Sequence, residues 1–84
     1  YERIRQMRES RQVNADEIIS LMQTTQSQFA DQWLIAVELY ELCLNFKTAV
    51  SATHQISQWL IDLQTRLPDK KHLIQEGMRL ANIL

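Results

Sequence analysis

The sequence predicts an all-α fold, because turn-forming residues are almost absent and apolar residues recur at helical spacing. Among the 84 residues, Gly77 is the only glycine and Pro68 the only proline, so residues 1–67 contain neither type. A β-sheet protein of this length needs many turns that contain Gly or Pro. We therefore expect a small helical bundle or an extended helical hairpin of four to five helices, with short connections and no β-sheet. Residues 1–84 are expected to form one domain.

The first two helices are predicted from the N-terminal third of the chain. Residues 1–12 carry apolar side chains at steps of three, with arginines between them, which is typical of a basic amphipathic helix. Asn14 and Glu17 form a capping-box pattern. In this pattern the Asn side chain accepts from the third helical N–H, and the Glu side chain reaches back. A helix should therefore begin at about Ala15.

Residues 15–45 predict either one long helix or a kinked pair, because apolar residues continue at steps of three and four. A single helix of about 30 residues would be about 45 Å long, too long for a compact protein of this mass. We therefore favour a break at Thr24–Ser27, with a new helix from about Gln28. Asn45 is expected to end the segment in a left-handed conformation, which Asn tolerates well.

The last two helices are predicted over residues 48–67 and 69–84. Thr48 or Ser51 is expected to cap the first of them. Pro68 disfavours helix at the residue before it and suits the first turn of a new helix. Inside that new helix Gly77 costs about 1 kcal/mol relative to Ala. This cost indicates either that another backbone passes close to Gly77 or that the helix is marginal.

The segment Trp33–Leu44 is the strongest functional signal, since ten of its twelve residues are hydrophobic. A helix that is apolar on nearly every face must be buried on nearly every face. It is either the central helix of a monomeric bundle or is covered on one side by another chain. We favour the second interpretation. The predicted contact residues are Trp33, Val37, Tyr40 and Leu44, with Trp59 and Leu63 on the next helix.

Charge is unevenly distributed, although the net charge is only −1. Residues 1–12 carry four arginines and two glutamates, residues 13–62 one lysine and six acidic residues, and residues 63–84 four basic and two acidic residues. These totals give +2, −5 and +2, a pattern that favours either a chain folded back on itself or one stacked on a copy. The predicted electrostatic contacts are Arg3, Arg5, Arg8 and Arg11.

The sequence contains few of the residue patterns that catalysis, phosphate binding or metal binding requires. One glycine cannot build a phosphate-binding loop, and one cysteine with two separated histidines lacks zinc-site spacing. Glu38 and Glu41 are three residues apart, but no Glu-x-x-His motif completes a di-metal bundle site. We therefore predict no catalytic residue, no cofactor and no metal. Cys43 lies in an apolar run and is expected to be a buried structural thiol.

Two alternative functions have specific support in the sequence. Residues 3–35 can be divided into helices, with a turn at Gln23–Gln26 and a recognition helix at Ser27–Ile35. In this reading the segment Ile4–Glu9 resembles phage-repressor-type helix–turn–helix domains. That recognition helix contains no Arg or Lys, so nucleic-acid binding is disfavoured. The second alternative is a small all-helical enzyme, because the length is similar to that of the helical chorismate mutases. Such enzymes gather several basic residues around a dicarboxylate, whereas residues 13–62 offer only Lys47.

The favoured function is therefore a non-enzymatic interaction module, such as an assembly, adaptor, chaperone or regulatory subunit. Its partner would be a second copy or a larger protein, and self-association is the leading expectation. No apolar run approaches the roughly 20 residues of a membrane span. A single cysteine and the absence of a signal-peptide pattern favour the cytoplasm. The first residue is Tyr rather than Met, so the chain is expected to be a trimmed piece or part of a larger protein.

Overall fold

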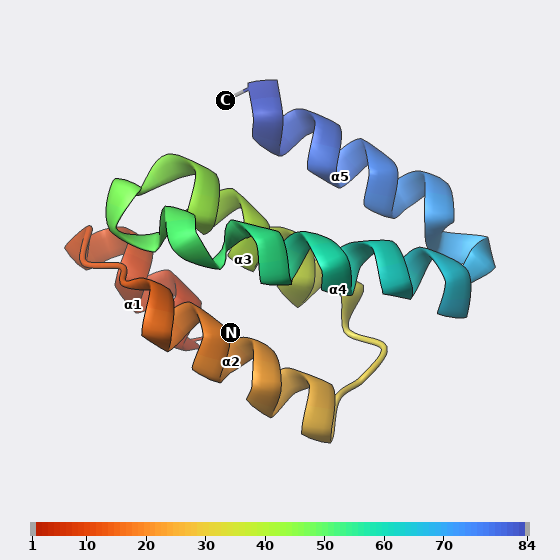
Figure 1. Ribbon diagram of the computed structural model, residues 1–84, viewed down its shortest axis with the longest axis horizontal. Coiled ribbons are helices and arrows are strands. Elements are labelled where there is room, and N and C mark those ends of the chain that lie inside the picture. Colours follow the sequence, from red (N-terminus) through yellow and green to blue (C-terminus); the bar gives the residue numbers. More distant parts are fainter. Residues whose placement is uncertain (1, 84) are drawn as a thin grey trace.

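The computed structural model of the chain describes residues 2–83 and is shown in Figure 1. Its helices are listed here in chain order: α1 (Glu2–Ser10), α2 (Ala15–Gln28), α3 (Trp33–Asn45), the 3₁₀ helix η1 (Lys47–Ala52), α4 (Thr53–Arg66), the 3₁₀ helix η2 (Pro68–Lys70) and α5 (Lys71–Ile83). Residues 2–83 contain no strand, so the all-α prediction is confirmed. The ends of the predicted first and last helices, residues 1 and 84, lie outside the described residues.

The helices form a bundle rather than an extended hairpin, with principal extents of 34 × 29 × 21 Å. Figure 1 shows α4 antiparallel to both α3 and α5, so that α3 and α5 run parallel to each other. On the other side of α3 lies α2, which also contacts η1, and α1 packs on α3. The largest fully buried side chains come from every α-helix: Ile4, Met7, Ile18, Thr25, Leu39, Leu42, Cys43, Ile56, Leu60, Leu63 and Ile74.

The second helix begins at Ala15, where the capping pattern places it. The Asn14 side-chain oxygen accepts a hydrogen bond from the Glu17 N–H at 2.9 Å. Only half of the predicted capping box forms, however. The Glu17 carboxylate accepts from the Arg3 guanidinium of α1 instead of reaching back to Asn14. A basic residue brought close by the fold thus replaces a local contact.

Residues 15–45 form two helices, but the break lies later than predicted. The hydroxyl residues Thr24–Ser27 remain within α2, and the chain leaves the helix at Phe29–Gln32. The Phe29 N–H bonds to the Thr25 carbonyl, and α3 starts at Trp33, the first residue of the apolar run. A continuous helix of about 45 Å would exceed the longest extent of 34 Å. The turn therefore folds the apolar run back into the core.

The prediction of a left-handed cap at Asn45 is wrong. Asn45 is the last residue of α3, and Phe46 follows it in an extended conformation, with its N–H bonded to the Leu42 carbonyl. The left-handed non-glycine residue among the described positions is Arg11, which follows α1 with a φ of 56°. Short polar residues and Gly adopt this conformation more easily than Arg does.

The predicted helix 48–67 is helical up to Arg66 but divides into η1 and α4 at Thr53. Neither predicted cap forms at its start. Instead, the Thr48 hydroxyl donates to the Val13 carbonyl, which joins η1 to the start of α2. The apolar residues that recur at helical spacing in this segment are buried: Ala49, Ala52, Ile56, Trp59, Leu60 and Leu63. The helix ends at Arg66, and Pro68 opens η2, which leads directly into α5.

Gly77 marks a close approach of α5 to Val37 of α3. A Cβ atom built on Gly77 would lie 2.9 Å from Cγ1 and 3.1 Å from Cγ2 of Val37. Such distances force a displacement of one side chain or of the helix. The predicted close approach is therefore present, although a side chain rather than a backbone fills the space.

Gly77→Ala is expected to destabilise the protein by about 1–2 kcal/mol, because overpacking against Val37 outweighs the gain of about 1 kcal/mol in helix propensity. In a Val37→Ala background the same substitution is expected to stabilise the fold, since the obstructing methyl groups are gone. Urea denaturation of the wild type, both single variants and the double variant measures this coupling. Stabilisation by Gly77→Ala with Val37 present would contradict the packing.

Candidate interaction surface

The six predicted contact residues divide into two groups. Tyr40, Trp59 and Leu63 are 7%, 4% and 0% exposed, so the chain's own helices cover them. The Tyr40 hydroxyl also accepts a hydrogen bond from the Asn82 amide of α5 at 3.0 Å. The other three, Trp33, Val37 and Leu44, are half-buried on α3. In this conformation only the second group is accessible to another molecule.

Exposed leucines surround the contact between Val37 and Gly77. Leu34 lies one helical turn before Val37 on α3 and is 57% exposed. Leu73 and Leu80 lie one turn on either side of Gly77 on α5, with exposures of 51% and 48%. Residues three or four apart in a helix lie on the same face. Because Val37 touches Gly77, these leucines belong to one continuous surface, which we call the α3–α5 face.

The α3–α5 face is directed away from α4. Gln64 of α4 contacts the Met78 sulfur at 3.8 Å, and Leu73 and Leu80 lie about 140–160° around α5 from Met78. On α3, Leu34 lies about 180° around the helix from Cys43, which is fully buried in the core. The helix that covers the α3–α5 pair on one side thus leaves the opposite side open.

The remaining exposed large apolar residues are distributed over other parts of the molecule. Ile83 continues the exposed edge of α5 beyond Leu80. Phe29, Val50 and Ile61 lie in the α2–α3 connection, η1 and α4 respectively. Apolar residues that are exposed singly are normal on soluble proteins. Phe29, Val50 and Ile61 therefore provide controls for the α3–α5 face.

The polar stripe of α3 faces the basic helix α1. Guanidinium nitrogens of Arg8 lie 3.8 Å from a carboxylate oxygen of Glu38 and 3.8 Å from one of Glu41. These three side chains are partly exposed, and the distances exceed those of hydrogen bonds. One arginine therefore balances two glutamates through space. The basic N-terminal end meets the acidic middle within the chain, so this part of the charge pattern needs no second copy.

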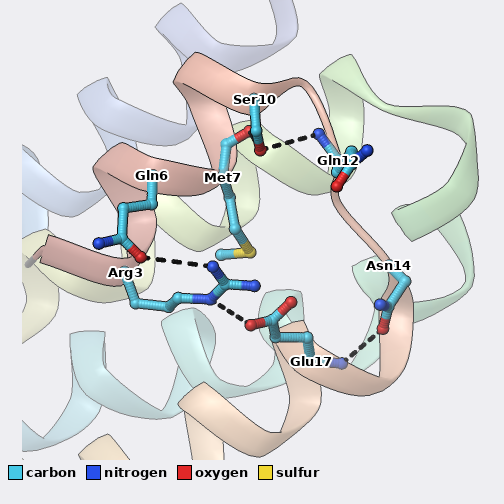
Figure 2. A network of polar contacts seen from close by, with 7 residues as sticks. All are labelled: Arg3, Gln6, Met7, Ser10, Gln12, Asn14 and Glu17. Atoms are coloured by element: carbon cyan, nitrogen blue, oxygen red, sulfur yellow. Dashed lines mark hydrogen bonds and ion pairs between the residues drawn. The ribbon is translucent and has the colours of Figure 1, made fainter.

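The other predicted electrostatic residues also make contacts within the chain. Figure 2 shows the Arg3 guanidinium directed at Glu17, and this pair joins α1 to α2. Arg5 contacts Glu2 at 2.6 Å and Glu9 at 4.0 Å along its own helix. The Arg11 guanidinium lies over the Phe46 ring, 5.6 Å from its centroid.

No group of three or more His, Cys, Asp or Glu residues within 2–83 is placed to hold a metal ion. Burial raises the pKa of the Cys43 thiol to about 11, against a smaller opposing effect of the Thr53 hydroxyl. His54 and His72 are exposed on the surface. In the same part of the chain, every helix is too short or too polar to cross a membrane.

The helix–turn–helix division of residues 3–35 does not match the structure. Its proposed turn, Gln23–Gln26, lies inside the continuous helix α2. Its proposed recognition helix, Ser27–Ile35, is interrupted at residues 29–32. The structural basis of that alternative is therefore wrong.

Comparisons with known proteins do not identify a relative: no family model, curated protein or solved structure matches this chain. The α3–α5 face is thus defined by the geometry of this molecule alone.

The predicted contact set omitted the three exposed leucines. A signal for two of them was present in the sequence, because apolar residues of α5, with Ile83 included, cover an arc of about 220°. One neighbouring helix covers a narrower arc than this. Leu34 had a signal of another kind, because it lies on the same side of the predicted helix as Glu38 and Glu41, the two polar residues of Trp33–Leu44.

Arg3→Gln is expected to raise the pKa of Glu17 towards its ordinary value of 4.5, because the Arg3 hydrogen bond lowers that pKa in the folded protein. The contribution of this pair to stability is fully present above the unfolded-state pKa and is lost as the pH falls through the lower folded-state pKa. Nuclear magnetic resonance titration of Glu17 measures the shift, with Arg5→Gln as a control that leaves it unchanged. If the Glu17 pKa were the same in Arg3→Gln and in the wild type, the Arg3–Glu17 pair would not form in solution.

Cys43 is expected to react slowly with a thiol reagent at pH about 8, because a thiol with a raised pKa carries little reactive thiolate and is buried in the core. Labelling in native buffer and in denaturing urea measures the difference. Rapid labelling of the native protein, at the rate seen in urea, would show that α3 is not covered as described.

Proposed function

We propose that this chain is a non-enzymatic protein–protein interaction module that self-associates by packing its α3–α5 face against the same face of a second copy. The observation that carries the proposal is the group formed by Leu34, Leu73 and Leu80, each about half exposed on the side of the bundle that α4 leaves open. Apolar surface grouped in this way is typical of interaction sites. A symmetric dimer would bury both copies of the face together.

The electrostatic contacts support packing rather than nucleic-acid binding. Three of the four N-terminal arginines, Arg3, Arg5 and Arg8, lie close to carboxylates of the same chain. Their charge is therefore less available to the phosphates of a nucleic acid.

The expected association is weak to moderate. Fully burying a leucine contributes about 1.5–3 kcal/mol, so burying the exposed half of each contributes about 1 kcal/mol. Six leucines in a symmetric dimer then contribute about 6 kcal/mol, which is near the lower limit of the roughly 4–15 kcal/mol cost of association. The additional free energy needed for a stable dimer must come from contacts of Val37, Leu44 and Ile83. We therefore expect a dimer that dissociates on dilution through the micromolar range.

Sedimentation equilibrium across the micromolar range is expected to show a reversible monomer–dimer equilibrium. The variant Leu73→Gln/Leu80→Gln is expected to weaken the dimer at least about tenfold, equivalent to about 1.4 kcal/mol. Ile61→Gln is the matched control, because Ile61 is 50% exposed but lies on α4.

A strictly monomeric wild type at every concentration would contradict self-association. Equal weakening by Ile61→Gln and by the double variant would show that the α3–α5 face is not the interface. Urea denaturation of each variant must give the wild-type free energy of unfolding for the comparison to hold.

A further inference from the structure

A second feature of the surface, separate from the α3–α5 face, centres on Arg11. This residue lies between two ion pairs, Arg3–Glu17 on one side and Arg8–Glu41 on the other. It lines a hollow next to each pair, of about 390 Å³ and about 410 Å³. Volumes of this size are in the range of small-molecule sites.

The charge of Arg11 is not balanced within the described chain. Each hollow contains one carboxylate, Glu17 or Glu41, and each of these is paired with a different arginine. No carboxylate of residues 2–83 is recorded within 4.0 Å of the Arg11 guanidinium, which stacks on Phe46 instead. A guanidinium held against an aromatic ring keeps its N–H groups directed outward, and these can bind an oxyanion in a bidentate manner.

The backbone at Arg11 is also unusual for this residue type. Its φ of 56° lies in the left-handed region, where Gly or Asn has a lower cost. Residues held in such conformations cluster at binding sites, which makes an observed outlier a reason to look for one. The conformation of Arg11 places its side chain over Phe46, at the wall of the larger hollow.

We propose that the larger hollow binds an oxyanion, a carboxylate or a phosphate, between the guanidinium groups of Arg11 and Arg8. The side-chain amide of Asn45 lines the same hollow and offers a further donor. Phe46 and Leu42 supply an apolar wall for the group that carries the anion. The carboxylate of Glu41 lines the hollow as well, and Arg8 lies 3.8 Å from both Glu41 and Glu38. Arg11 is therefore the basic residue of this hollow that no carboxylate of residues 2–83 contacts, and it is expected to be the main ligand of the oxyanion.

A titration of the isotope-labelled protein with phenyl phosphate, and a second one with benzoate, tests the proposal. Two-dimensional nuclear magnetic resonance spectra record the chemical shifts at each step. Sodium chloride at matched ionic strength is the reference. Saturable shifts are expected at the Arg11 side-chain N–H and at the Asn45 and Phe46 amides. A lower dissociation constant for phenyl phosphate would assign the site to phosphates, and a lower one for benzoate would assign it to carboxylates.

Arg11→Gly separates binding from a purely structural role, because glycine relieves the backbone and the fold is expected to persist. This variant is expected to weaken binding at least about tenfold. Arg5→Gln removes the same charge from a position outside the hollow and is expected to bind as the wild type does. Shifts that do not saturate, that chloride reproduces, or that Arg11→Gly retains would overturn the proposal.

Discussion

The whole structure depends on the need to cover α3. Its residues Trp33–Leu44 are apolar on nearly every face, so one neighbouring helix cannot remove them from water. The chain places α4 and α5 along α3, α2 against a further side and α1 beside its polar stripe. Leu39 and Cys43 are fully buried as a result. The break at residues 29–32 serves the same purpose, because only a reversal of the chain brings α2 back along the apolar run.

Two features allow the neighbouring helices to pack closely on α3. Gly77 lacks a side chain where Val37 projects, so α5 can approach α3 closely. Arg8 lies near both Glu38 and Glu41, which lets the polar stripe of α3 face another helix. The cover is nevertheless incomplete. The close approach of α5 leaves Leu34, Leu73 and Leu80 around the contact, and these exposed leucines are the basis of the proposed self-association.

Helix type and the major stops could be predicted from the sequence, because they depend on local chemistry. Asn14 caps α2, and Pro68 separates α4 from α5. Features that depend on distant residues could not be predicted. Glu17 turns to Arg3, and Thr48 bonds to Val13, only because the fold brings these residues together.

The same limit applies to the candidate surface. Periodicity identified α3 as the helix that needs cover, but it could not say that Tyr40, Trp59 and Leu63 would be covered by the chain itself. The charge pattern pointed to Arg11 as a basic contact residue, but it could not predict the left-handed backbone of Arg11 or its stacking on Phe46, a residue 35 positions away.

The most direct test of the central role of α3 is native-state hydrogen exchange, followed residue by residue as denaturant is added. If α3 is enclosed as described, the amides of Leu39, Leu42 and Cys43 exchange only when the whole domain unfolds, with the free energy of global unfolding. Amides of α1, a short helix that packs on α3 and buries Ile4 and Met7, exchange through local opening at a lower free energy. Exchange of the α3 amides by local opening, while α4 and α5 stay protected, would contradict the account.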